Sequence, residues 1–300
     1  MNVRHVVLDF DGTCTQVDQT AKLYLGTHRA LLEQEVGAGF VAHWQDACNA
    51  VIEASPEAAW QALGGSPAAP AAADPYILAG EAVAWITRRF KENPSWGALP
   101  PIPTDVYKRA YREAEAPFRA ELVEVVKKLL ALGVTVTFVS NSATDTIAAR
   151  LDGLFKDTEL RRKIRVYGGA NKYVVKELAF DRPAPPPAVA QRFHDLAAGV
   201  HVAGLVRPVY LRRGDYFHAL TQVWGEAAFV PEQTLIAGDV YELDLAMPLA
   251  LGTYAYLVER EPLFPTYAYE RDAVLASGRG TIAKDLSDLP KRVASLLSQA

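Results

Sequence analysis

The sequence predicts an α/β fold, in which a doubly wound, Rossmann-like parallel sheet carries an inserted α-helical cap. Three short apolar runs, at 3–8, 134–139 and 234–237, end directly in polar residues, which is typical of buried strands. Segments with helical periodicity separate them, and this alternation favours a parallel sheet covered on both faces. Because ligands of such sheets lie at the carboxyl ends of the strands, we expect the functional site there.

Each predicted helix of the core shows apolar residues at helical spacing, at 122–130, 217–224 and 289–297. Gly133 is placed to end the first of them, and Pro290 lies near the first turn of the last. A further helix is expected between Asp244 and Gly252. These segments supply helices for both faces of the sheet.

Residues from about 19 to 116 interrupt the alternation and are interpreted as the cap, which leaves 1–18 and 117–300 as the core. We expect cap helices around 20–36, 40–52 and 81–90, and a loop at 66–75. A second interruption, at about 156–206, is interpreted as an atypical insertion in the core. The first interruption is expected to pack a small core of its own, because it holds four of the five tryptophans: Trp44, Trp60, Trp85 and Trp96.

Composition narrows the classes of function. The chain has 300 residues, of which 50% are hydrophobic and 22% charged, and its net charge of −4 argues against a broad nucleic-acid-binding surface. The longest mainly apolar stretches, 196–206 and 246–258, are shorter than the roughly 20 residues that cross a membrane. Two cysteines, Cys14 and Cys48, are too few for a disulfide framework. We expect a cytoplasmic protein whose partners include neither nucleic acid nor membrane, and leave its oligomeric state open.

Asp9 and Asp11 follow the first predicted strand at once, in Asp-Phe-Asp-Gly-Thr. Two carboxylates this close repel each other unless a cation or a proton separates them, so the pair predicts bound Mg²⁺ or divergent pKa values. Gly12 allows a tight turn, and Thr13 offers a hydroxyl and a backbone N–H. A solvated turn is the alternative, since Asp and Gly are ordinary turn residues.

Two more acids, Asp239 and Asp244, follow the third predicted strand in Gly238-Asp-Val-Tyr-Glu-Leu-Asp244. Burial of Asp239 at the end of a strand would be costly without a cation. Asp244 opens the next predicted helix, and capping that helix is the alternative to a role in metal binding. The candidate metal ligands are therefore Asp9, Asp11, Asp239 and Asp244.

Taken in order, these motifs resemble those of the haloacid dehalogenase (HAD) superfamily. Val6-Val-Leu-Asp-Phe-Asp-Gly-Thr13 resembles the first motif, Phe138-Val-Ser-Asn-Ser142 the second, and Leu235-Ile-Ala-Gly-Asp-Val-Tyr-Glu-Leu-Asp244 the fourth. The resemblance covers roughly 1–18, 117–155 and 207–260, and extends to neither interruption.

The resemblance implies a mechanism. Asp9 would attack phosphorus to give an aspartyl-phosphate, and Asp11 would protonate the leaving oxygen and then deprotonate water. Mg²⁺ would be held by Asp9, the main-chain carbonyl of Asp11, and Asp239. Superfamily members that cleave carbon–halogen bonds replace the second acid, so Asp11 favours phosphate-ester hydrolysis. The residues implied to hold the phosphoryl oxygens are Gly12 and Thr13, through their backbone N–H groups, with Ser140 and Asn141.

The third motif departs from the superfamily pattern, which has a lysine before the helix that leads to the fourth. Arg213, 26 positions before Asp239, is the first choice for this phosphate-binding role, because arginine clamps phosphate with two hydrogen bonds. Arg212 comes next, and Lys172 or Lys176 could reach in from the atypical segment 167–176.

The sequence as a whole predicts a Mg²⁺-dependent phosphatase that acts on a small phosphorylated metabolite. A cap that closes over the site would exclude water and choose the substrate, which makes a folded phosphoprotein substrate less suitable. Two alternatives stay open. One is phosphoryl transfer from Asp9 to an acceptor other than water, and the other is a protein that binds a phosphorylated ligand or partner without turnover.

Overall fold

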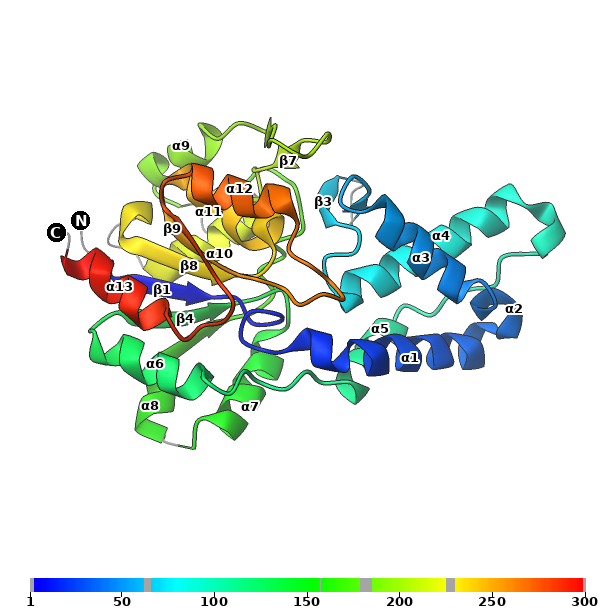
Figure 1. The fold of residues 1–300 in the computed structure, drawn as a ribbon, viewed down its shortest axis with the longest axis horizontal. Coiled ribbons are helices and arrows are strands. Elements are labelled where there is room, and N and C mark those ends of the chain that lie inside the picture. The colour runs from blue at the N-terminus through cyan, green and yellow to red at the C-terminus, as the bar shows by residue number, and fades with distance from the viewer. Residues whose placement is uncertain (1–2, 62–65, 157, 179–184, 225–229, 299–300) are drawn as a thin grey trace.

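A six-stranded sheet with helices on both faces forms one part of the molecule, and a helical cap lies beside it (Figure 1). The structure is a computed structural model that describes residues 3–61, 66–156, 158–178, 185–224 and 230–298. None of the helices in these ranges combines the length and the hydropathy of a membrane span.

The sheet has the strand order β10-β9-β8-β1-β4-β5, and every neighbouring pair is parallel. The predicted parallel α/β core is therefore confirmed. β1 lies between β4 and β8, which places the carboxyl ends of all three side by side. The strands are β1 (His5–Leu8), β4 (Thr135–Val139), β5 (Ile164–Tyr167), β8 (Thr234–Gly238), β9 (Tyr254–Val258) and β10 (Gly280–Ala283).

Alternate strand residues face the two helical layers, as the period of a strand requires. In β8, Leu235 and Ala237 pack into one hydrophobic cluster, and Ile236 packs into the other. The first cluster includes α6 (Leu122–Ala131), α7 (Thr144–Leu154) and α13 (Leu289–Ser298). The second includes α9 (Pro187–His194), α10 (Gly214–Trp224), α11 (Ala246–Leu251) and α12 (Ala268–Ala276).

The cap has its own hydrophobic core, as its tryptophans predicted, with Trp44 buried and Trp85 and Trp96 packed against the cluster. One prediction is wrong: the expected loop at 66–75 holds a strand, β3, and the first residue of α4, which Asp74 caps. The cap elements are α1 (Val17–Val36), α2 (Ala38–Val41), α3 (Trp44–Ala54), β2 (Ala59–Gln61), β3 (Pro67–Pro70), α4 (Pro75–Glu92), the 3₁₀ turn η1 (Pro94–Trp96) and α5 (Val106–Glu113).

The second interruption is smaller than the sequence indicated. β5 lies inside the range 156–206 and pairs with β4, so it belongs to the central sheet. The sequence pattern did not predict β5, because this strand is short and contains the exposed Arg165. A strand at the edge of a sheet need not be apolar. The remaining short elements of the core are α8 (Thr158–Arg162), β6 (Gly199–Val200), β7 (Val209–Tyr210), the 3₁₀ turn η2 (Pro231–Gln233) and the π-helical turn η3 (Tyr241–Leu245).

The segment that follows β9 joins the core to the cap. Phe264, which is 5% exposed, belongs to the hydrophobic cluster of the cap although it lies in a core segment. Figure 1 shows this segment, in orange, running from the sheet towards the cap. Its neighbour Leu263 is 54% exposed.

Replacing Phe264 with Ala should lower the free energy of unfolding by about 3 kcal/mol, because it leaves a cavity in the cap core. Chemical denaturation measures the loss. Leu263→Ala is the matched control and should change stability by less than about 0.5 kcal/mol. Equal effects of the two substitutions would contradict the anchoring role of Phe264.

Candidate functional site

Three strand ends meet at one edge of the sheet. Leu8 is in register with Phe138 of β4 and with Ala237 of β8, so the polar residues that follow these strands become neighbours. The backbone N–H of Asp9 donates to the carbonyl of Ala237 at 2.9 Å, which continues the pairing one residue beyond β1. The parallel sheet thus brings together segments that lie far apart in the sequence.

Asp9, Asp239 and Asp244 form a buried acidic cluster, in which one oxygen of each carboxylate lies within 4.8 Å of the others. The Thr13 hydroxyl lies between two of them, 3.1 Å from Oδ2 of Asp9 and 3.0 Å from Oδ1 of Asp239. A hydroxyl has one proton and can satisfy only one carboxylate at a time. The cluster therefore holds more acceptor oxygens than this hydroxyl can satisfy.

Burial and the repulsion between carboxylates raise the pKa values of Asp9 and Asp239. Desolvation, with Asp244 and Asp9 close by, raises the pKa of Asp239 well above its usual range. Desolvation also raises the pKa of Asp9, to about 7, although Lys172 opposes the shift. A divalent cation would relieve both the desolvation and the repulsion. Carboxylate oxygens are ligands that Mg²⁺ prefers, so the donor set of Asp9, Asp239 and Asp244 fits this ion.

Two glycines let the backbone come close to these carboxylates. Gly12 has φ +85°, and a Cβ there would lie 2.3 Å from Oδ2 of Asp239. A Cβ on Gly238 would lie 2.3 Å from Cβ of Asp244. The N–H of Gly12, an expected phosphate ligand, donates to Oγ1 of Thr15 at 3.2 Å.

Lys172 supplies positive charge inside the cluster. Its Nζ donates to Oδ1 of Asp9 at 2.6 Å and to Oδ1 of Asp244 at 2.8 Å, and its side chain is 1% exposed. Burial alone would lower the pKa of this ammonium, but Asp244 and Asp9 together raise it above its usual range. Oδ2 of Asp244 accepts from the N–H of Val240 at 3.1 Å. One oxygen of Asp244 therefore binds Lys172, and the other binds the backbone of the loop after β8.

The structure places Arg213, the first choice for the third motif, elsewhere. Its guanidinium is fully buried and donates to three main-chain carbonyls, those of Lys172 (2.5 Å), Ala68 (2.7 Å) and Tyr210 (3.1 Å). These bonds direct it to the backbone and to the β3 strand of the cap. Within the part of the chain that the structure describes, none of its hydrogen bonds goes to a carboxylate of the acidic cluster.

The two other basic candidates also contact different groups. Arg212 donates to Oε1 of Glu177 at 2.9 Å, and Lys176 pairs with Oδ1 of Asp215 at 3.0 Å. Of the four residues weighed for this role, Lys172 is the one that contacts Asp9.

Asp11 lies apart from the acidic cluster and faces the cap. Its carboxylate accepts from the hydroxyl of Tyr111 on α5 at 2.9 Å and from that of Ser142 at 2.8 Å. Burial raises the pKa of Asp11, and these two hydrogen bonds only partly offset the shift. A carboxyl group with a raised pKa at a cavity wall can donate a proton, which is a different role from that of a metal ligand.

Ser140 and Asn141 lie where β4 ends. Oγ of Ser140, which is 2% exposed, accepts from the N–H of Ser142 at 3.1 Å, and Oδ1 of Asn141 accepts from the N–H of Lys172 at 2.7 Å. Both line a cavity of about 930 Å³ between core and cap, together with Asp9 and Asp11. Thr13 is fully buried.

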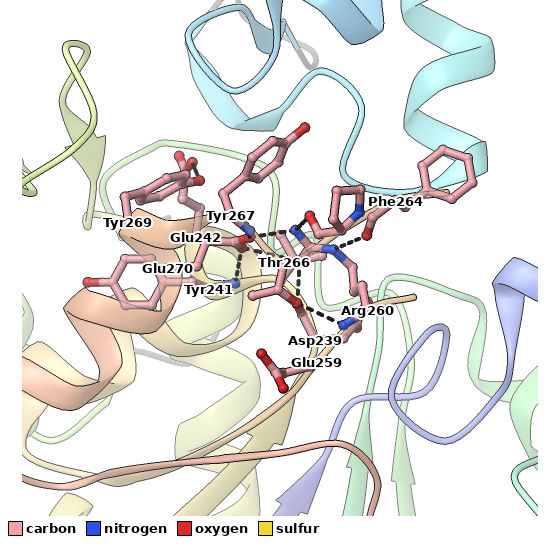
Figure 2. A network of polar contacts seen from close by, with 12 residues as sticks. Asp239, Tyr241, Glu242, Glu259, Arg260, Phe264, Thr266, Tyr267, Tyr269 and Glu270 are labelled. Carbon is pink, nitrogen blue, oxygen red and sulfur yellow. Dashed lines mark hydrogen bonds and ion pairs between the residues drawn. The ribbon is translucent and has the colours of Figure 1, made fainter. Parts of the chain in front are cut away.

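A buried ion pair supports the loop after β8 (Figure 2). Arg260 and Glu270 lie 2.5 Å apart, and their side chains are 5% and 0% exposed. Arg260 also donates to the main-chain carbonyl of Asp239, while Oε1 of Glu270 accepts from the N–H of Tyr241 at 3.1 Å. The pair therefore holds the backbone on both sides of Val240.

No family model matches the chain, and no curated protein matches its sequence. Solved structures do match. A putative HAD hydrolase from Bacillus subtilis bound to magnesium, YfnB, is 14% identical, with 98% of this chain and 100% of that chain covered and a TM-score of 0.49. A HAD phosphatase from Thermococcus onnurineus is 11% identical, with 97% and 98% covered and a TM-score of 0.47.

An L-2-haloacid dehalogenase from Xanthobacter autotrophicus also matches, at 18% identity, 97% and 98% coverage and a TM-score of 0.45. These names belong to the superfamily that the sequence motifs resemble. They include both a phosphatase and a dehalogenase. A likeness of this degree leaves the chemistry to be argued from the residues of this chain.

Sequence reasoning assigned no role to Tyr111, Ser142 or the Arg260–Glu270 pair. Ser142 lies in the second motif, two positions after Ser140, and this position in the motif was the only sequence feature that pointed to the site. Tyr111 lies in the cap, where the motifs give no guidance. Arg260 acts on the backbone of Asp239, a contact that no local pattern predicts.

Gly12→Ala should lower the free energy of unfolding by at least about 1 kcal/mol, because it strains a positive φ and displaces the carboxylate of Asp239. Denaturant titration measures the change. Gly26 of α1 is the control: a Cβ there would meet nothing within 4 Å beyond the backbone of its own helix, and Gly26→Ala should stabilise the helix by about 0.5–1 kcal/mol. A neutral Gly12→Ala would contradict the tight packing at Asp239.

Proposed function

We propose that the chain is a HAD-type, Mg²⁺-dependent phosphatase that hydrolyses a small phosphorylated metabolite through an aspartyl-phosphate on Asp9. The observation that carries the proposal is the buried contact of Lys172 with Asp9 and Asp244, next to an Asp11 that is hydrogen-bonded on the cap side. Two carboxylates are thus paired with the ammonium group, and a third, that of Asp11, lies where it could exchange a proton with the substrate.

Asp9 is suited to act as the nucleophile. It stands at the end of β1 on the wall of the cavity, and Lys172 holds one of its oxygens at 2.6 Å. The attack of a carboxylate oxygen on phosphorus forms the aspartyl-phosphate and expels the leaving oxygen. The positive charge of Lys172 favours the ionised form of Asp9 that this step requires.

Asp11 is suited to move the proton. Its raised pKa favours a protonated carboxyl group that gives its proton to the leaving oxygen. The resulting carboxylate can then take a proton from the water that attacks the aspartyl-phosphate. The hydroxyls of Tyr111 and Ser142 fix the orientation of this carboxyl group and leave it on the cavity wall.

Asp9, Asp239, Asp244 and the main-chain carbonyl of Asp11 are the groups that would hold Mg²⁺, which supplies positive charge between nucleophile and phosphate when bound. Ser140, Asn141, and the backbone N–H groups of Gly12 and Thr13 remain the proposed phosphate ligands. We assign the third-motif role to Lys172 in place of Arg213, since Lys172 contacts Asp9 and Arg213 contacts backbone carbonyls.

The position of the cap favours a small substrate. The cavity lies between cap and core, and residues of α4 and α5 form part of its wall. A substrate held there is removed from bulk water, which strengthens the interactions of its phosphate with charged groups. The protein is proposed to act on free metabolites and to need neither nucleic acid nor membrane.

Wild-type protein should release phosphate from p-nitrophenyl phosphate in the presence of Mg²⁺ and stop when the metal is chelated. Asp9→Asn should lower kcat by at least about 10⁴-fold, because the amide is not a nucleophile. A phosphate-release assay measures both, with circular dichroism as the check on folding. Activity of Asp9→Asn near the wild-type value would contradict the assignment.

The same assay separates the alternatives. Added alcohol acceptors that yield phosphorylated product would indicate transfer, and free phosphate alone indicates hydrolysis. Wild-type protein that binds phosphate but releases none from aryl phosphates over a broad pH range would favour a binding protein.

Lys172→Ala should weaken the binding of inorganic phosphate more than Arg213→Ala does, and lower kcat by at least about 100-fold. Arg213→Ala should mainly lower the melting temperature, because it leaves buried carbonyls without donors. Calorimetric titration and thermal unfolding measure the two effects. Arg212→Ala is the control, and the reverse ranking would return the role to Arg213.

A further inference from the structure

Aromatic side chains form much of the cavity wall beyond the acidic cluster. They come from β2, from the first turn of α4, from α5 and from the segment after β5, so both core and cap contribute. The tryptophan and tyrosine residues that line this wall, among those the structure describes, are Trp60, Tyr76, Tyr107, Tyr111 and Tyr173. The cavity of about 930 Å³ has room for much more than a phosphoryl group.

An apolar subsite adjoins the catalytic aspartates. The rings of Trp60 and Tyr173 lie 4.9 Å apart at an interplanar angle of 42°, and Tyr173 directly follows Lys172. Both rings pack against a hydrophobic cluster that includes Ile77, Val240 and Leu243, and these three also line the cavity. The apolar surface therefore continues from the cap onto the loop that carries Asp239 and Asp244.

A second aromatic group lies beside the proposed proton donor. The rings of Tyr76 and Tyr111 are 5.2 Å apart, and Tyr111 donates its hydroxyl hydrogen to Asp11. Because Asp11 would protonate the leaving oxygen, the leaving group departs next to these rings. Among the described residues, the buried hydroxyl of Tyr76 has no hydrogen-bond partner.

The charges farther along the wall are balanced. Among the described residues that line the cavity away from the acidic cluster, the two basic side chains, Lys108 and Arg112, are matched in number by two acidic ones, Asp74 and Asp145. A leaving group with its own carboxylate or phosphate would gain little there. Flat, uncharged rings pack well against tryptophan and tyrosine.

We propose, on the basis of the proposed phosphatase function, that the substrates are phosphate monoesters whose leaving group carries an aromatic ring and no second anionic group. Trp60 and Tyr173 contact this ring and determine the preference for it.

Benzyl phosphate and cyclohexylmethyl phosphate test this inference, because their leaving alcohols are similar in size and acidity and differ in having a flat or a puckered ring. Wild-type kcat/KM should be about tenfold higher for benzyl phosphate. Trp60→Leu and Tyr173→Leu should each reduce this ratio to about threefold or less. Trp85→Leu, a cap tryptophan that does not line the cavity, is the control and should keep the wild-type ratio.

Equal kcat/KM for the two esters would overturn the inference and leave the phosphatase function standing. The same holds if the preference survives both leucine substitutions. Absence of Mg²⁺-dependent release from either ester, with Asp9→Asn behaving as the wild type, would overturn the phosphatase function and the inference with it.

The ion pair of Arg260 and Glu270 carries a second, independent inference. Arg260 donates to the carbonyl of Asp239 and Glu270 accepts from the N–H of Tyr241, so the pair fixes the peptide units that set the direction of the Asp239 side chain (Figure 2). Arg260 also donates to the carbonyl of Phe264 at 3.1 Å. We infer that Arg260 is a positioning residue for the proposed metal ligand Asp239.

Calorimetric titration with Mg²⁺ tests this role without relying on turnover. Arg260→Gln should raise the dissociation constant of Mg²⁺ by about 10- to 100-fold, since groups that orient ligands typically have effects of this size. Arg260→Lys keeps the charge without the forked geometry, should also weaken binding, and decides the question if Arg260→Gln does not fold. Arg271→Gln is the control, because Arg271 pairs with the half-exposed Glu259.

A merely structural role would lower the melting temperature and leave Mg²⁺ affinity unchanged within about twofold, and that result would overturn the positioning role. Equal weakening by Arg271→Gln would overturn it as well. Wild-type protein that takes up no Mg²⁺ would overturn the proposed metal site and this inference together.

Discussion

The buried concentration of negative charge at the end of β1 is the constraint on which the rest of the site depends. Three carboxylates in a desolvated space repel one another, and each loses hydration that the protein must replace. Lys172 replaces part of it through two short ion pairs, and the Thr13 hydroxyl replaces another part. The negative charge that these contacts leave uncompensated favours the binding of a cation. The proposed nucleophile, the proposed metal ligands and the ammonium group of Lys172 therefore belong to one connected set of charges.

The strand order of the parallel sheet brings these charged residues together. β1 stands between β4 and β8, so residues that follow three separate strands converge without any long loop having to place them. The cap then adds what the sheet edge lacks, which is a second wall and a hydroxyl from Tyr111 for Asp11. The core thus holds the charges, and the cap shapes the space that the rest of the substrate would fill.

The sequence predicted the parts that depend on local pattern. Apolar runs located β1, β4 and β8, and the motifs after them located Asp9, Ser140 and Asp239. It did not find β5 and β3, because a half-exposed edge strand and a strand that begins and ends in proline lack an apolar signal. It also ranked Arg213 above Lys172. Both residues precede α10, and which side chain reaches Asp9 depends on how the segment after β5 packs, which spacing along the chain does not encode.

The buried guanidinium of Arg213 has a consequence for how the two halves can move. It joins the carbonyl of Lys172 in the core to that of Ala68 in β3, and β3 also packs in a hydrophobic cluster with Val240 and Leu243 of the core. Moving β3 away from the core would leave these buried polar groups without hydrogen-bond partners. Each unsatisfied group would cost roughly 1–3 kcal/mol of free energy. An opening of the cap that keeps these hydrogen bonds would therefore have to turn the cap helices about this point, which lies beside Lys172.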